Sequence, residues 1–175
     1  MYHTFATAVW SDGVTLFVAG WGNDATLAQS AALLWTRPLG ANTLASNTTL
    51  GQGCGSLRMA ATTRPVMAGS WNLAAVGAPS TTTFGVTWLG VADPGIIDLA
   101  YLGLPDCQQR ASIDVLFGPW TPVSGRSTLA MAVPANLPWL IGLHAYVQSA
   151  AFTIPAPNPF GAITSNGIVG TIGDH

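Results

Sequence analysis

The sequence predicts an all-β protein, a two-sheet antiparallel sandwich of immunoglobulin-like or jelly-roll-like type with an N-terminal β-hairpin appendage. The first reason is that its 175 residues include no Lys and no Glu, the residues that usually cover exposed helix faces. The second is the presence of 20 Gly and 12 Pro, which separate short runs rich in Thr, Val, Ile and Trp. This mixture is typical of many short strands joined by tight turns.

Two strand-like segments that flank Ser-Asp-Gly predict the N-terminal hairpin (residues 3–20). The tripeptide fits a three-residue loop with Gly13 in the left-handed conformation. The next stretch, Asp24–Trp35, fits either a helix capped by its first residue or a loop followed by a strand over residues 31–36. The β pattern that precedes it favours the strand.

Seven further strands are expected at regular intervals after residue 50. They are Ser56–Thr62, Ser70–Val76, Thr82–Val91, Ala111–Phe117, Arg126–Val133, Trp139–Ala150 and Gly161–Ile172. Turn sequences lie between them, at Asp93-Pro94-Gly95, Pro105-Asp106, Ser124-Gly125 and Asn166-Gly167. Strands at this spacing are typical of a two-sheet sandwich. We therefore expect a sandwich domain over residues 51–175, with residues 1–50 as a hairpin and connecting segment.

The two cysteines of the chain, Cys54 and Cys107, allow one intramolecular pairing. Each lies in a corner that contains Gly or Pro, Gly-Cys-Gly and Pro-Asp-Cys. Two buried thiols would be the ordinary interpretation in a cytosolic protein. The rest of the chain has an extracellular character, which favours a disulfide. A bridge that closes a loop of about fifty residues stabilises a fold by about 4 kcal/mol in the chain-entropy model.

An ordered set of short motifs runs from residue 53 to residue 173. It consists of Gly53-Cys54-Gly55, Asp98-Leu99 with Leu102-Gly103, Pro105-Asp106-Cys107, Val133-Pro134, Leu140–Gln148, Asn158-Pro159 and Thr164–Gly173. This set resembles a C-terminal domain common on large secreted proteins of planctomycetes and related bacteria. The resemblance implies an extracellular or cell-surface structural module, and it supplies no catalytic residues.

Residues 10–20 resemble one blade of the propeller repeats that often precede such a domain. A single blade cannot close a propeller. It would have to pack on the sandwich, pair with another chain, or belong to a larger array. The residues after Met1 lack the pattern of a signal peptide, so an exported form would be a mature protein or a piece of a longer chain.

Composition argues against several functional classes. The net charge of −2 offers no basic field for nucleic acid. No apolar run approaches the ~18 residues of a membrane helix.

Residues 20–25 match the dinucleotide fingerprint G-x-G-x-x-A, but the required acidic residue about 20 positions later is missing, so a glycine-rich hairpin end is the better interpretation. With three His, no Glu and no G-x-S-x-G, we expect neither an enzyme nor a cofactor.

Three aspartates are candidate metal ligands. Asp93, Asp98 and Asp106 fall in one connection and could hold calcium. Asp beside Pro and Gly is more often turn chemistry, so the metal content is left open. His144 is out of phase with its apolar neighbours and is expected to face outward beside Tyr146 and Gln148, in a structural role.

The seven Trp residues are numerous for a chain of this size. Trp71 and Trp88 alternate with apolar positions and are expected to be buried. The others lie near strand ends or turns, at Trp10, Trp21, Trp35, Trp120 and Trp139. Together with Tyr they could stack on sugar rings if they form a planar row, which makes a carbohydrate-binding module the alternative function. The other interpretation is that they pack the ends of the sandwich.

The lack of Lys also bears on the partners of the chain. Soluble β proteins protect their edge strands with charged residues, above all Lys. This chain has few charged residues and no Lys. A protein with unguarded edges either hides them behind loops or uses them for association. We expect a secreted structural module that binds other copies of itself or other extracellular proteins, as in a surface layer or filament.

Overall fold

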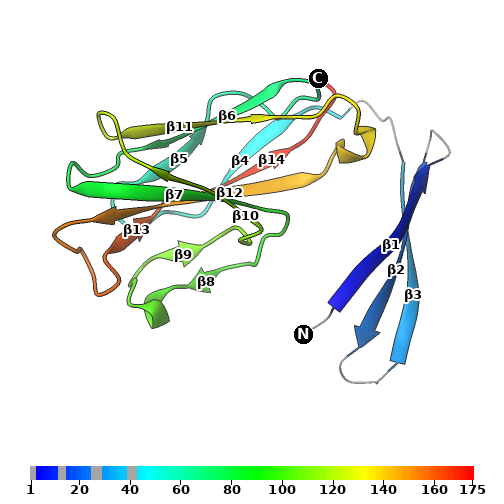
Figure 1. Cartoon of the computed structure of the whole chain (residues 1–175), viewed down its shortest axis with the longest axis horizontal. Coiled ribbons are helices and arrows are strands. Elements are labelled where there is room, and N and C mark those ends of the chain that lie inside the picture. The colour runs from blue at the N-terminus through cyan, green and yellow to red at the C-terminus, as the bar shows by residue number, and fades with distance from the viewer. Residues whose placement is uncertain (1–2, 12–14, 25–28, 39–42) are drawn as a thin grey trace.

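The computed structural model describes residues 3–11, 15–24, 29–38 and 43–175 (Figure 1). Nearly all of its regular structure is antiparallel strand, which confirms the all-β class and the sandwich. The two short helical turns are η1 (Ala100–Leu102) and η2 (Pro138–Leu140). Within the described residues, no helix is long and apolar enough to cross a membrane.

The N-terminal region forms a sheet of three strands in the order β1 (His3–Ser11), β2 (Thr15–Asp24) and β3 (Gln29–Pro38). The predicted hairpin is therefore present as β1 and β2. The strand alternative for the stretch Asp24–Trp35 is confirmed, because β3 pairs with β2. The expected Gly13 loop lies outside the described residues. Within the described part of the chain, no strand pairing joins this sheet to the sandwich, from which Figure 1 draws it apart.

A sheet of six strands forms one layer of the sandwich. Its order is β10 (Val115–Trp120), β7 (Thr82–Gly90), β12 (His144–Thr153), β14 (Gly167–Thr171) and β4 (Ser46–Leu50), and β13 (Ala162–Thr164) also pairs with β12. Strand β4 pairs with β14 and adds to the strands expected from the sequence. The sheet therefore includes residues before 51, although the division into two domains remains a prediction.

The opposite layer has three strands in the order β11 (Arg126–Ala132), β6 (Ser70–Val76) and β5 (Arg58–Ala61). The core between the layers includes fully buried side chains such as Leu57, Leu73 and Val147. Trp71 and Trp88 are 3% and 6% exposed, as predicted. A two-stranded arm, residues 97–109, consists of β8 (Ile97–Asp98), η1 and β9 (Gln108–Gln109).

Several strand predictions need correction at their ends. The strand expected from Trp139 starts at His144, because Pro138 begins the helical turn η2. The strand expected from Ala111 starts at Val115, and the segment before it is held by the hydrogen bonds of residues 112 and 114. The Ser124-Gly125 turn is confirmed, with φ values of 51° and 71° that fit a two-residue hairpin loop.

Asn166-Gly167, predicted as a turn, instead lies at an irregularity between β13 and β14, which follow each other along the same partner strand. Strands β13 and β14 both pair antiparallel with β12. The register changes from Ala150 opposite Thr164 to Val147 opposite Ile168, so the β13–β14 side has one extra residue. An extra residue of this kind is a β-bulge, which redirects a side chain without ending the strand path.

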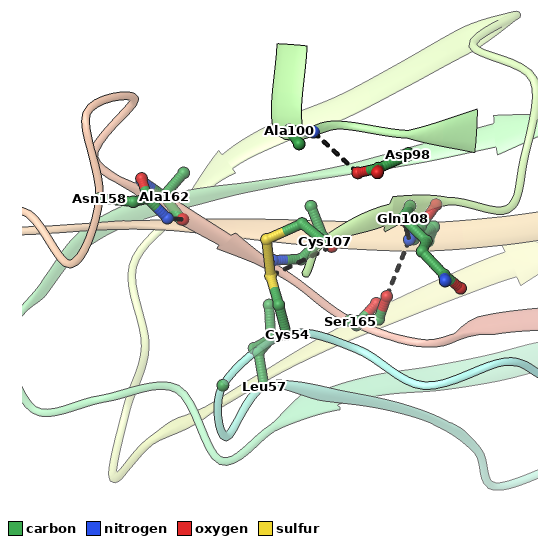
Figure 2. The surroundings of a disulfide bond; sticks show 12 residues. Cys54, Leu57, Asp98, Ala100, Cys107, Gln108, Asn158, Ala162 and Ser165 are labelled. Atoms are coloured by element: carbon green, nitrogen blue, oxygen red, sulfur yellow. Dashed lines mark hydrogen bonds between the residues drawn. A yellow bond between two sulfur atoms is a disulfide. The ribbon is translucent and has the colours of Figure 1, made fainter. Parts of the chain in front are cut away.

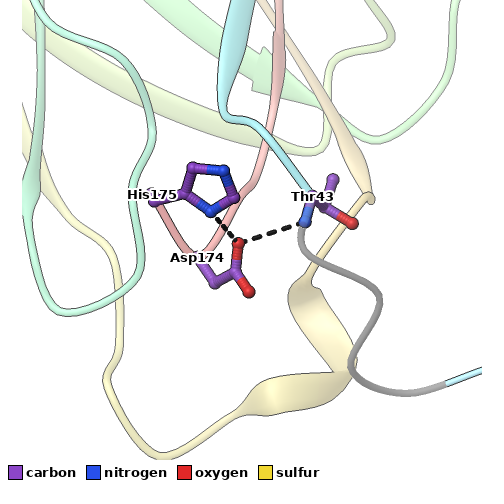
Figure 3. A network of polar contacts seen from close by, with 3 residues as sticks. All are labelled: Thr43, Asp174 and His175. Carbon is purple, nitrogen blue, oxygen red and sulfur yellow. Dashed lines mark hydrogen bonds and ion pairs between the residues drawn. The ribbon is translucent and has the colours of Figure 1, made fainter.

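The C-terminal residues lie against the segment that leads into β4 (Figure 3). The Asp174 carboxylate accepts a hydrogen bond from the Thr43 N–H at 3.1 Å and contacts His175 Nδ1 at 2.6 Å. The N–H of Ala45 donates to the backbone carbonyl of His175. The start of β4 and the end of the chain are therefore held together.

Candidate interaction surfaces

The disulfide predicted between Cys54 and Cys107 is present in the structure, with Cα atoms 4.8 Å apart (Figure 2). It joins the segment before β5 to the arm. Gly53 allows the segment before β5 to lie close to β13, because a Cβ at residue 53 would be 2.6 Å from the carbonyl oxygen of Thr164. The Cys54 N–H donates to that same carbonyl. The bridge therefore ties the arm to both layers of the sandwich.

Gln148 fixes the arm at a second point. Its side chain is fully buried and makes three hydrogen bonds. The amide nitrogen donates to the carbonyls of Gln108 and Ser165 at 2.7 and 2.8 Å, and the amide oxygen accepts from the Arg110 N–H at 2.8 Å. The prediction that Gln148 faces outward was therefore wrong. Strand β12 is a central strand covered on both faces, so alternation does not place half of its side chains in water.

Asn166, in the bulge, joins the two layers. Its side-chain oxygen accepts from the Met59 N–H at 2.9 Å, and its amide nitrogen donates to the Met59 carbonyl at 3.0 Å. The amide thus pairs with β5 as a neighbouring strand would. Nearby, Ser149 and Thr87 share a buried hydroxyl contact of 2.7 Å. We call Gln148, Ser149, Ser165 and Asn166 the buried polar cluster; each has its hydrogen-bond partners inside the chain.

The three candidate metal ligands act in local turns. Asp93 accepts from the Gly95 N–H, and Asp98 accepts from the Ala100 N–H. Asp106 has a positive φ of 63° in the turn that follows Pro105. In the described part of the chain, no three His, Cys, Asp or Glu residues form a group that could hold a metal ion.

Asp114 is a further carboxylate that organises its surroundings. It accepts from the Val91 N–H and from the Ser112 hydroxyl, both at 2.8 Å. The hydrogen bond from Val91, followed by that from Ser112, lowers the pKa of this carboxyl below its ordinary value. Its role is to hold the end of β7 against the segment before β10.

Three of the four Trp side chains that the structure describes are held by hydrogen bonds to the rest of the chain. Trp71 donates to Asn47, Trp88 to the Ala111 carbonyl and Trp120 to the Thr87 hydroxyl. Trp139 is 39% exposed. The side chains of Trp10, Trp21 and Trp35 lie outside the described part of the structure. His144 is exposed, as predicted, and its ring lies 3.1 Å from the Thr171 hydroxyl.

An apolar groove lies on the face of the six-stranded sheet that points away from β5. Thr87 and Ser149 point toward Met59 of β5, so their neighbours Trp88 and Ala150 point to the opposite face. The groove has a volume of about 200 Å³. Its lining includes Trp88, Leu102, Ile113, Leu116, Phe152 and Phe160.

This groove is not among the features expected from the sequence. Leu116 is 66% exposed and Ile113 is 56% exposed, so large apolar side chains reach solvent at its rim. A signal was available in the segment Ile113–Phe117, which is apolar at adjacent positions as well as alternate ones. Apolar residues on both sides of an edge strand indicate a surface that lacks its covering.

No model of a known protein family matches this chain, and neither the curated proteins nor the solved structures compared with it include a match.

Proposed function

We propose that this chain is a secreted, non-enzymatic structural module that acts by protein–protein contact and associates with copies of itself, as a subunit of an extracellular layer or filament would. The observation that carries the proposal is the apolar groove on a chain in which 7% of residues are charged. Exposed apolar surface without flanking charge favours association in water, because burying it releases ordered solvent.

The arm gives this surface a fixed shape. Leu99, Leu102 and Leu104 of the arm line one side of the groove. The Cys54–Cys107 bridge and Gln148 hold the arm against the sheet. A groove with a rigid wall loses little conformational entropy when a partner docks, which favours binding.

An extracellular location is supported by the same bridge. Structural disulfides persist in oxidising compartments and are rare in the cytosol. The bridge closes a segment with a sequence separation of 53 residues, long enough to contribute substantially to stability. A non-enzymatic role is supported by the described titratable residues, because the aspartates serve turns and His144 contacts a hydroxyl rather than a carboxylate.

The mass of the full chain, measured by sedimentation from low to high micromolar concentration, tests self-association. We expect the average mass to rise with concentration, and Leu116→Asp to reduce that rise. Ile154→Asp is the matched control, because Ile154 is 72% exposed and does not line the groove. A monomer at every concentration would contradict self-association. A Leu116→Asp variant that associates like the unchanged chain would show that the groove is not the contact surface.

A further inference from the structure

Among the edge strands of the sandwich, β10 and β5 are closed to further pairing, and β4 and β13 are short, with five and three residues. Strand β10 shifts register after Phe117 and contains Pro119, which has no N–H. Strand β5 has four residues, and the Asn166 amide occupies the backbone N–H and carbonyl of Met59. Strand β11 is different: it has seven residues and pairs with β6 without a register shift.

Hydrogen bonds at both ends of β11 show which of its backbone groups face outward. Arg126 exchanges both of its backbone hydrogen bonds with Val123, on the side away from β6. The Val133 N–H donates to Gly69, on the side of β6. Because successive residues of a strand point their backbone groups to opposite sides, Thr128, Ala130 and Ala132 point outward. Within the described residues, none of these three has a strand partner on that side.

The side chains along this edge present no obstacle to another strand. Thr128, Ala130 and Ala132 are exposed, small and uncharged, whereas Leu129 and Met131 pack against the core. A cavity of about 210 Å³ lies between β11 and the end of β10. From residue 127 to residue 132 the edge therefore lacks the charge, proline or bulge that blocks edge pairing in most β proteins.

We propose that β11 pairs antiparallel with β11 of a second copy, with Ala130 opposite Ala130 of that copy. The three open residues are symmetric about Ala130, so one two-fold register pairs Thr128 with Ala132 and satisfies all of them. Three reciprocal pairs form about six backbone hydrogen bonds. Two-fold symmetric contacts of this kind are the commonest in homo-oligomers. The dimer joins the two three-stranded sheets into one continuous sheet.

The ends of the open run limit the pairing to this register. Arg126 is already paired with Val123, and Pro134 has no N–H to donate. In the two-fold arrangement the two Arg126 side chains lie at opposite ends of the joint, so no like charges meet. A short edge-to-edge joint buries little surface, so we expect a weak dimer. This inference rests on the proposed self-association, but it uses a different surface from the groove.

Charge substitutions at residue 130 test the register, because this residue would meet its own copy. We expect Ala130→Lys and Ala130→Glu each to weaken the dimer about fivefold at low ionic strength, measured by sedimentation equilibrium. An equimolar mixture of the two variants should associate at least as tightly as the unchanged chain. The mixture also shows that both variants are folded. Thr48→Lys, which places the same charge on exposed residue 48 of β4, is the control and should leave the dimer unchanged.

The outcomes of these measurements distinguish the β11 dimer from self-association in general. If the unchanged chain associates and residue 130 variants associate equally well, the β11 dimer is overturned while self-association stands. If each residue 130 variant weakens the dimer and the mixture fails to restore it, the two-fold register is overturned. A chain that stays monomeric at every concentration overturns both the proposed function and this inference.

Discussion

The buried polar cluster and the outer edge of β11 differ in how their polar groups are hydrogen-bonded. In the cluster, Gln148 and Asn166 satisfy backbone groups that the strands leave unpaired, and all of the partners lie inside the chain. Along β11, the backbone groups of Thr128, Ala130 and Ala132 have no such partner among the described residues. In our proposal, stability rests on the residues of the cluster and association on those of the β11 edge, so single substitutions should separate the two.

The largest expected effect comes from breaking the bridge. Replacing both cysteines, Cys54→Ser with Cys107→Ser, should lower the free energy of unfolding by about 2–5 kcal/mol, because the unfolded chain regains the freedom of a long loop. Urea unfolding of the full chain measures this loss. Reduction of the unchanged protein should give a similar loss. Equal stability of the reduced and oxidised forms would show that the bridge does not contribute to the fold.

Gln148→Leu should have the next largest effect. The substitution leaves the Arg110 N–H and the carbonyls of Gln108 and Ser165 without partners, at a cost of about 2–4 kcal/mol in the free energy of unfolding. Gln109→Leu is the matched control: Gln109 donates one side-chain hydrogen bond and is partly exposed, so about 1 kcal/mol is expected. Similar losses for the two variants would contradict the central role of Gln148.

Asn166→Asp tests the hydrogen bonds between the two layers and barely changes the shape of the side chain. The carboxylate can still accept from the Met59 N–H, but it cannot donate to the Met59 carbonyl, so about 1–3 kcal/mol should be lost at neutral pH. The loss should shrink in acid, because a protonated carboxyl regains a donor. Thermal unfolding at neutral and at acid pH measures both effects. A loss that is independent of pH would contradict the proposed donor role.

The smallest effect is expected at Asp114, outside both regions. Its carboxyl has a lowered pKa in the folded state, so its contribution to stability is present above the ordinary pKa of 3.8 and is lost as the pH falls through the lowered value. Asp114→Asn should therefore be less stable than the unchanged chain near neutral pH. The difference should disappear in strong acid. A difference in the free energy of unfolding between the two proteins that stays constant across this pH range would contradict the linkage.

The features that sequence could predict are those set by local chemistry. Ser124-Gly125 needs two residues of positive φ, and that requirement is visible in the sequence. The pairing of Cys54 with Cys107 followed from there being two cysteines. Strand β11 alternates between exposed and partly buried residues because it belongs to a three-stranded sheet with one face in the core and the other toward solvent.

The features that sequence could not predict depend on which strands are neighbours. Strand β12 is central and covered on both faces, so the burial of Gln148 contradicts the alternation rule. Asn-Gly is a frequent turn signal, and its use here as a bulge depends on continued pairing with β12. The open edge at β11 likewise follows from strand order, which composition alone does not determine. The resemblance to a secreted bacterial domain and the extracellular role remain predictions.

Amide hydrogen exchange of the full chain, followed residue by residue at low and high micromolar concentration, tests the β11 dimer most directly. The amides of Thr128, Ala130 and Ala132 should exchange rapidly in dilute solution and become protected as the concentration rises. Those of Leu129 and Met131, which face β6, should be protected at both concentrations and serve as internal references. Exchange of the three outward amides that does not change with concentration would contradict the pairing of β11 with a second copy.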